Sequence, residues 1–198
     1  MKEIFLKIIN SSVHMHGLRE DNGHEEAVIG FAEILCKKYN ANEDIIIPAV
    51  ILHDIGYFGM DSTILKLMMQ NKLSKLKKEQ IKKEHMEKGA ILAESILKRL
   101  NYNNLLIPII TNIIKRHDLD NKPRNIEEKI VRDADKLWRY SDCGFFLDVK
   151  RRNCKIDEWH NKLSGNLDNP LYFYLEESKR IAREELEKKK NNSSSPKI

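Results

Sequence analysis

Cysteine is scarce in this sequence and is never clustered. The three cysteines, Cys36, Cys143 and Cys154, lie far apart, and no CxxC pair is present. This pattern argues against a disulfide framework and against a cysteine-based zinc ribbon. It is typical of a reducing compartment, so we expect a cytoplasmic protein.

Long hydrophobic runs and glycine-rich loops are missing as well. No apolar stretch approaches the roughly 20 residues that a membrane-spanning helix needs, and the N-terminal segment mixes charged with apolar residues, unlike a signal peptide. The eight glycines form no phosphate-binding loop. We therefore expect no membrane association and neither a Rossmann nor a P-loop architecture.

Positive charge exceeds negative charge, with a net charge of +5 at pH 7 and a pI near 9.0. Much of the excess lies in two lysine-rich stretches, residues 65–85 and 187–198. No RNP, KH or zinc-finger pattern accompanies these lysines. We interpret them as solvated helix faces and expect no nucleic-acid partner.

The chain has 198 residues, of which 41% are hydrophobic, enough for one domain with a sizeable core. Apolar residues recur at helical spacing and no useful stretch alternates with the period of a strand. The predicted fold is all-α, a compact multi-helix bundle over residues 1–190, followed by a disordered polar tail, 191–198. Predicted helices include one capped by Asp21 or Asn22 and ending near Tyr39, and further helices over 43–55, 84–100, 104–117 and 126–140. Residues 61–83 begin as a short helix and continue as a lysine-rich segment, either helix or mobile lid, that could cover a site.

An apolar run ends unexpectedly in His53 and Asp54. A buried imidazole and a buried carboxylate are costly to desolvate unless they pair, hydrogen-bond or bind a metal. Side chains of facing helices converge inside a bundle, so other residues near predicted helix ends could join them in one pocket. These are His24, His85, His117 and Asp135. Such nitrogen and oxygen donors without cysteine suit manganese, iron, cobalt, nickel or zinc, and disfavour a structural zinc site.

The order of these residues, H, then HD, then two histidines, then D, with the local sequences LHDIG and DADKL, resembles the HD superfamily of metal-dependent phosphohydrolases. The resemblance covers residues 24–138. It implies a metal site made by His24, His53, Asp54 and Asp135. His85, in HMEKGA, and His117, in KRHD, match the additional histidines of branches that hold two ions, and Asp54 would bridge the pair.

The resemblance implies a hydrolase for phosphate ester or anhydride bonds: a phosphomonoesterase, phosphodiesterase or pyrophosphohydrolase. A metal-activated hydroxide would attack a nucleotide or another small phosphate compound. Two divalent ions are expected, Mn, Fe, Co, Ni or Zn, with Mg also compatible. We assign catalytic roles to Asp54, His85, His117 and Lys136. Arg19, Arg116 and Lys136 are candidates for binding the substrate phosphate.

Several alternatives stay open from sequence. Asp133 could replace Asp135 as a ligand, and His85 and His117 could contact substrate beside a single ion. The aromatic residues Trp138, Tyr140, Phe145 and Phe146 could form a wall for a nucleobase or pack in the core. A di-iron oxygenase of the HD fold and a non-catalytic, metal-stabilised module that binds nucleic acid are the alternative functions.

Overall fold

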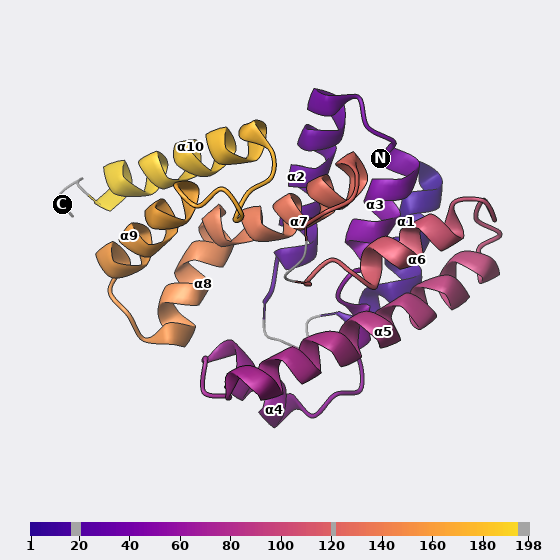
Figure 1. Ribbon diagram of the computed structural model, residues 1–198, viewed down its shortest axis with the longest axis horizontal. Helices are drawn as coiled ribbons and strands as arrows, with labels where there is room; N and C mark the ends of the chain where they lie inside the picture. The colour runs from indigo at the N-terminus through magenta and orange to yellow at the C-terminus, as the bar shows by residue number, and fades with distance from the viewer. Residues whose placement is uncertain (17–20, 120–121, 194–198) are drawn as a thin grey trace.

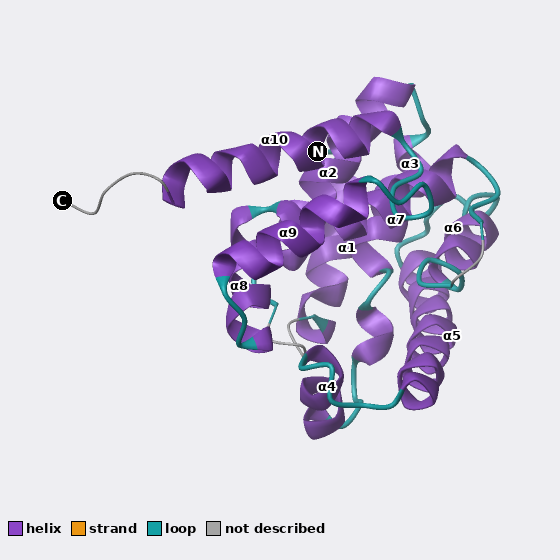
Figure 2. Ribbon diagram, turned by 60° about the vertical axis from the view of Figure 1, so that its left-hand side comes forward, coloured by secondary structure: helices purple, strands orange, loops and turns teal. Residues whose placement is uncertain are grey.

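The computed structural model describes residues 1–16, 21–119 and 122–193, and within these ranges all regular secondary structure is helical (Figures 1 and 2). The all-α prediction is thus confirmed. The helices are α1 (Glu3–Ser12), α2 (His24–Tyr39), α3 (Glu43–Leu52), α4 (Ser62–Met69), α5 (Lys75–Arg99), α6 (Ile107–Ile114), α7 (Ile126–Leu137), α8 (Asp142–Arg152), α9 (Ile156–Leu167) and α10 (Glu176–Ser193). Short 3₁₀ turns include η2 (Ile55–Tyr57) and η3 (Trp138–Tyr140).

Helix α3 forms the centre of the bundle. All eight residues from Ile45 to Leu52 are buried, as expected for a helix that is apolar on every side. Helices α1, α2, α6 and α7 pack around it, and α5 packs against α6 and η2. In Figure 1, α8, α9 and α10 form a separate layer on the left of the bundle, while α4 lies at the bottom.

Pro48 lies inside α3. It has no N–H group, so the carbonyl oxygen of Asp44, four residues earlier, loses its usual helical donor. The hydroxyl group of Tyr102 donates a hydrogen bond to this oxygen at 2.7 Å. A side chain from the loop after α5 therefore completes the backbone hydrogen bonding of the central helix.

One continuous hydrophobic core runs from Phe5 in α1 to Leu186 in α10. A smaller apolar cluster, formed by Tyr57, Leu65, Met68 and Ile81, attaches α4 to η2 and α5. Helix α4 is thus held in place by this small cluster and not by the main core.

The structure corrects several helix boundaries. Helix α2 has Gly23 at its N-cap in a left-handed conformation, with φ of 83° and no side-chain cap, instead of Asp21 or Asn22. The lysine-rich segment is helical from Lys75 onward, so that part is a helix and not a lid. Helix α10 continues to Ser193, past the expected start of the tail at Asn191, and residues 194–198 lie outside the described residues.

In the described part of the chain, no single helix is long and apolar enough to cross a bilayer. Only the pair Glu43–Tyr57 and Ser62–Met69, bent by 114°, reaches that length and composition together.

Candidate metal centre

Two histidines lie just beyond the ends of apolar helices. Helices α3 and α6 stop three residues before their predicted ends, at Leu52 and Ile114, and the last carbonyl groups of a helix lack intrahelical donors. The Nδ1–H group of His53 donates to Val50 at 2.6 Å, and that of His117 donates to Ile114 at 2.8 Å. These bonds fix both rings and leave each Nε2 free to bind an ion, the arrangement usual for metal-ligating histidines.

The first donor cluster contains His24, His53, Asp54 and Asp135. The Nε2 atoms of His24 and His53 lie 3.3 Å apart. Oδ2 of Asp54 lies 3.4 Å from His24 Nε2 and 3.1 Å from His53 Nε2. Oδ1 of Asp135 lies 3.6 and 3.5 Å from the same two nitrogens. Four donors from α2, α7 and the turn after α3 therefore surround one point.

The second cluster contains Asp54, His85 and His117. The Nε2 atoms of the two histidines lie 3.4 Å apart, and Oδ1 of Asp54 lies 3.7 Å from His85 and 3.6 Å from His117. The two oxygens of Asp54 thus belong to different clusters. One carboxylate joins both.

These spacings fit bound transition-metal ions. Metal bonds to imidazole and carboxylate are about 2.0–2.2 Å long, which places neighbouring ligand atoms roughly 3.0–3.5 Å apart in tetrahedral or octahedral geometry. Most of the distances in both clusters lie in or just above this range. His24, His53, Asp54, His85 and His117 are all buried, and burying these polar groups is costly unless they hydrogen-bond, form ion pairs or bind a metal.

Electrostatics within the first cluster favour a cation. Burial alone would lower the pKa of His53, but the negative charges of Asp54 and Asp135 raise it well above its ordinary value. Burial would likewise raise the pKa of Asp135, yet hydrogen bonding to His53 and the charges of His53 and His24 lower it. The carboxylates therefore attract positive charge strongly at the point where the four donors meet.

Residues 23–139, more than half of the chain, match the family model described as HD domain. The chain belongs to the HD-domain family. All six predicted ligands lie inside the matched range, and the family consists in general of metal-dependent phosphohydrolases that bind divalent metals. No curated protein and no solved structure matches the chain.

The position of His85 beside Asp54 depends on a close contact between η2 and α5. A Cβ atom on Gly56 would lie 1.8 Å from the carbonyl oxygen of His85 and 2.7 Å from the backbone nitrogen of Gly89, so only glycine allows η2 to approach α5 this closely. The next residue, Tyr57, stacks on the His85 ring with a centroid distance of 4.1 Å. Both contacts fix the position of His85 beside Asp54.

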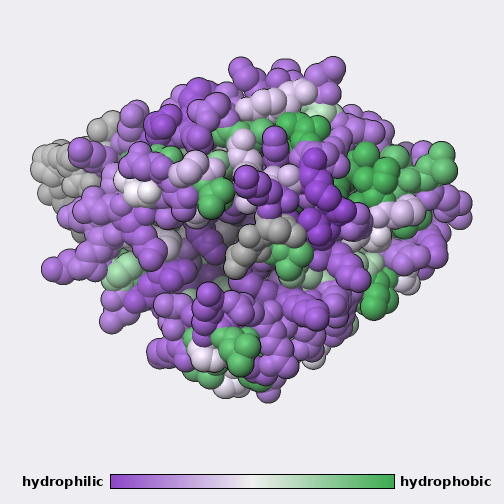
Figure 3. All heavy atoms as spheres, in the orientation of Figure 1, coloured by the Kyte–Doolittle hydropathy of each residue, from purple (hydrophilic) through white to green (hydrophobic). Residues whose placement is uncertain are grey.

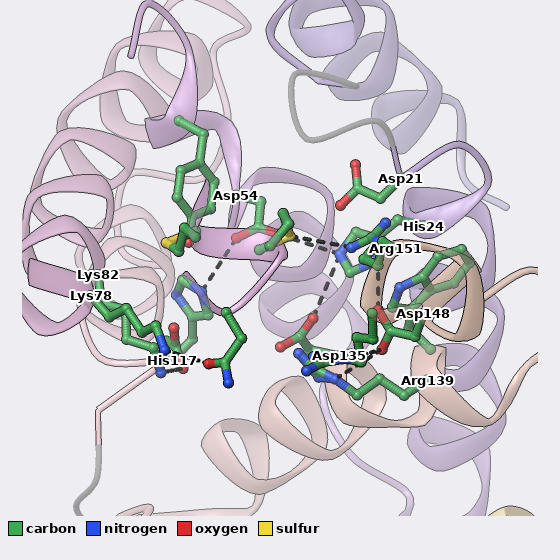
Figure 4. A pocket seen from close by; sticks show the side chains of 17 residues that line it. Asp21, His24, Asp54, Lys78, Lys82, His117, Asp135, Arg139, Asp148 and Arg151 are labelled. Atoms are coloured by element: carbon green, nitrogen blue, oxygen red, sulfur yellow. Dashed lines mark hydrogen bonds and ion pairs between the residues drawn. The ribbon is translucent and has the colours of Figure 1, made fainter. Parts of the chain in front are cut away.

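A cavity of about 190 Å³ opens onto the candidate metal ligands His24, Asp54, His117 and Asp135 (Figure 4). Its lining contains five aspartates, two of which are Asp54 and Asp135, and five cationic side chains. The cationic side chains that line it are Lys78, Lys82, Arg139, Arg151 and Arg152.

None of these five cations was predicted from sequence as a phosphate ligand, although a lid formed by the lysine-rich segment was one of the alternatives. Lys78 and Lys82 are four residues apart on α5 and so share one face of that helix. This spacing was the only feature of the sequence that could have indicated that both lysines face the cavity. Arg151 and Arg152 end α8, about 100 residues from the HD motif, and no local pattern connects them with it.

The three residues predicted to bind phosphate do not gather in this cavity. Lys136 is a correction: it points away, with Nζ donating to the carbonyl oxygen of Tyr172 and lying 4.5 Å from the centre of the Tyr174 ring. Arg116 is a second correction, because its Nε lies 3.3 Å from the buried carboxylate of Glu128. Arg19 lies outside the described residues.

Asp133 is not a ligand in either cluster. Its carboxylate accepts hydrogen bonds from the backbone N–H groups of Tyr174 and Leu175, at 2.9–3.1 Å, just before α10. Burial raises its pKa to about 6 despite these bonds. Asp133 therefore anchors the C-terminal segment, while Asp135, two residues later, faces the metal site.

The predicted aromatic wall is reduced to one residue. Trp138 lines the cavity and meets the His24 ring edge-on at 5.3 Å between ring centroids. Tyr140 and Phe145 are fully buried in the core, and Phe146 is half exposed away from the cavity lining. Core packing is the role that the structure supports for Tyr140 and Phe145.

Proposed function

We propose that this HD-domain protein is a metal-dependent phosphohydrolase that acts on a nucleotide or another small phosphate compound, at a monoester, diester or pyrophosphate bond. One observation carries the proposal. The two oxygens of the Asp54 carboxylate lie in different clusters. Oδ2 lies beside the Nε2 atoms of His24 and His53, and Oδ1 lies beside those of His85 and His117. Such a shared carboxylate is what two neighbouring ions need in order to act together on one phosphate group.

The two clusters would hold the divalent cations. When bound, these cations would act as Lewis acids and lower the pKa of water towards 7. Hydrogen bonds from Nδ1–H orient the rings of His53 and His117, and stacking on Tyr57 orients His85, so these three side chains need little reorganisation to bind an ion. Because the ligands are fixed, a phosphate can approach the ions only from the cavity in front of Asp54 and Asp135.

Cationic side chains in the cavity wall would orient the phosphate. Lys82 is paired with Asp118 at 2.8 Å, which holds its ammonium group at the cavity edge near His117. Arg139 lines the opposite side, next to Asp135 (Figure 4). Cations placed on both sides of a phosphate stabilise the negative charge that develops during hydrolysis.

The test combines metal content with hydrolysis. Wild-type protein purified without chelator or His-tag is compared with Asp54→Ala by mass spectrometry of metals and on a panel of nucleotides and phosphate esters. About two equivalents of a transition metal and phosphate release in the wild type, both lost in Asp54→Ala, would support the proposal. Asp168→Ala, an exposed aspartate at the end of α9, serves as the control and should behave as wild type.

Other outcomes would point to the other functions. Turnover that requires dioxygen and iron, and stops under anaerobic conditions with manganese, would replace hydrolysis by oxygenase chemistry. Ligand variants that unfold the protein without removing any turnover, together with salt-sensitive binding of nucleic acid, would indicate a binding module. Either result would reject the hydrolase.

A further inference from the structure

A second depression, of about 910 Å³, lies between α4 and α8. Its lining includes five cations, Lys66, Lys72, Lys150, Arg151 and Arg152, and no aspartate or glutamate. We call it the α4–α8 groove. In Figure 1, α8 lies on the left and α4 at the bottom of the molecule, and Figure 3 shows that the surface of this part is mainly hydrophilic.

The α4–α8 groove adjoins the metal-site cavity. Met69, Arg151 and Arg152 line both. A ligand could therefore touch the metal ligands at one end and the groove at the other. The metal-site cavity alone, at about 190 Å³, is smaller than the roughly 300–1,000 Å³ of ordinary small-molecule pockets, whereas the two spaces together are large enough for a nucleotide.

The arginines at the junction are organised by one buried carboxylate. Asp148 on α8 lies 3.6 Å from Arg151, 3.9 Å from Arg152 and 3.8 Å from Arg139. Three guanidinium groups thus lie within 3.9 Å of this one carboxylate. Guanidinium groups bind phosphate through paired N–H donors, and Asp148 holds these three near one another.

Arg151 also connects the two walls of the groove. Its Nη1 lies 3.2 Å from the Sδ atom of Met69 on α4. A thioether is a weak acceptor, and a phosphate oxygen would be a stronger one. An anion entering here would exchange a weak contact for a charge-assisted hydrogen bond.

The outer cations of the groove are available to an anion. Lys66, Lys72 and Lys150 are exposed, and among the described residues no carboxylate lies within 4.0 Å of their Nζ atoms. Helix α4 carries Lys66 and α8 carries Lys150, so the charges face the groove from both sides.

We propose that the α4–α8 groove binds the further phosphate groups of a substrate with an extended phosphate chain, such as a nucleoside triphosphate. The inference rests on the proposed hydrolase function. The phosphoryl group that reacts lies at the metal site, and the next phosphates are held first by Arg151 and Arg152 and then by Lys66 and Lys150. In this arrangement, a monoester whose single phosphate lies at the metal site makes no use of these lysines.

The test measures binding and turnover separately. The groove variant Lys66→Gln/Lys150→Gln is compared with Lys37→Gln/Lys115→Gln, which also removes two exposed lysines but on α2 and after α6. Calorimetric titration with tripolyphosphate should show about fivefold weaker binding for the groove variant than for the control variant. Orthophosphate should bind both equally. Equal tripolyphosphate binding in the two variants would overturn the proposal.

Turnover separates this subsite from the function on which it rests. With metal, kcat/KM for a nucleoside triphosphate should fall about fivefold in the groove variant, while that for p-nitrophenyl phosphate should not change. Hydrolysis that is lost in Asp54→Ala but insensitive to the groove variant would reject the subsite and leave the hydrolase standing. If the groove variant binds tripolyphosphate more weakly but the wild type hydrolyses no substrate, the subsite would stand and the hydrolase function would be rejected. An oligonucleotide that binds more tightly than tripolyphosphate would replace the small substrate by nucleic acid.

Discussion

A methyl group on Gly56 would lie 1.8 Å from the carbonyl oxygen of His85. The backbone of η2 thus rests directly on α5 at the residue that supplies a histidine to the second metal cluster. Gly56→Ala should force η2 and α5 apart and destabilise the protein by about 1–3 kcal/mol, as overpacking of a core usually does. Urea denaturation measures the loss. The second ion should be lost with it, because His85 moves away from Asp54.

Gly165→Ala is the matched control. Gly165 lies inside α9, and a Cβ atom there would meet nothing within 4 Å. Alanine should therefore stabilise the helix by about 0.5–1 kcal/mol. A Gly56→Ala protein with wild-type stability and full metal content would show that the close contact does not position His85.

The sequence predicted the six candidate ligands partly from local pattern and partly from the order that they share with the HD superfamily, and the structure brings them into two clusters. A histidine or aspartate that ends an apolar helix is recognisable from its neighbours, as His53 and Asp54 are. The all-helical fold was equally accessible from periodicity. The helix boundaries were harder to predict. Helix α3 ends at Leu52, where the His53 side chain donates a hydrogen bond to the carbonyl oxygen of Val50. A propensity pattern contains no information on such a bond.

The phosphate-binding residues could not be predicted in the same way. Lys136 adjoins the ligand Asp135 in sequence, but the helical turn of about 100° per residue directs it towards Tyr172 instead of the cavity. Arg151 reaches the cavity only because α8 folds back beside it. Neighbours in sequence on a helix face different directions, and the residues that do line the cavity come together only in the tertiary structure.

Replacing His117 should remove one ion and leave the other. His117 belongs to the cluster with Asp54 and His85, and the four-donor cluster that contains His24 does not include it. His117→Gln should therefore retain about one metal equivalent of two and lose most activity on phosphate substrates. Mass spectrometry of metals measures this. His160→Gln on α9, away from both clusters, should keep both ions; two ions in His117→Gln would contradict the assignment.

The hydroxyl group of Tyr102 should matter because Pro48 is inside α3. Tyr102→Phe leaves the carbonyl oxygen of Asp44 without the donor that replaces the missing N–H, and should cost about 1 kcal/mol of unfolding free energy. In a Pro48→Ala background the new N–H can donate to Asp44, so Tyr102→Phe should cost less there. A double-mutant cycle by urea denaturation tests the coupling, and strictly additive losses would refute it.

Asp148 should contribute to stability by neutralising the arginines around it. Asp148→Asn leaves Arg139, Arg151 and Arg152 without their shared carboxylate. We expect a loss of about 1–3 kcal/mol, less than for a fully buried pair because the arginine side chains are partly exposed to screening solvent. Asp157→Asn, at an exposed position in α9, should be neutral.

In the Asp148→Asn variant, the three guanidinium groups repel one another. Tripolyphosphate should therefore raise the Tm of Asp148→Asn more than that of the wild type. An equal rise in both would show that Asp148 does not balance the charge of this cluster.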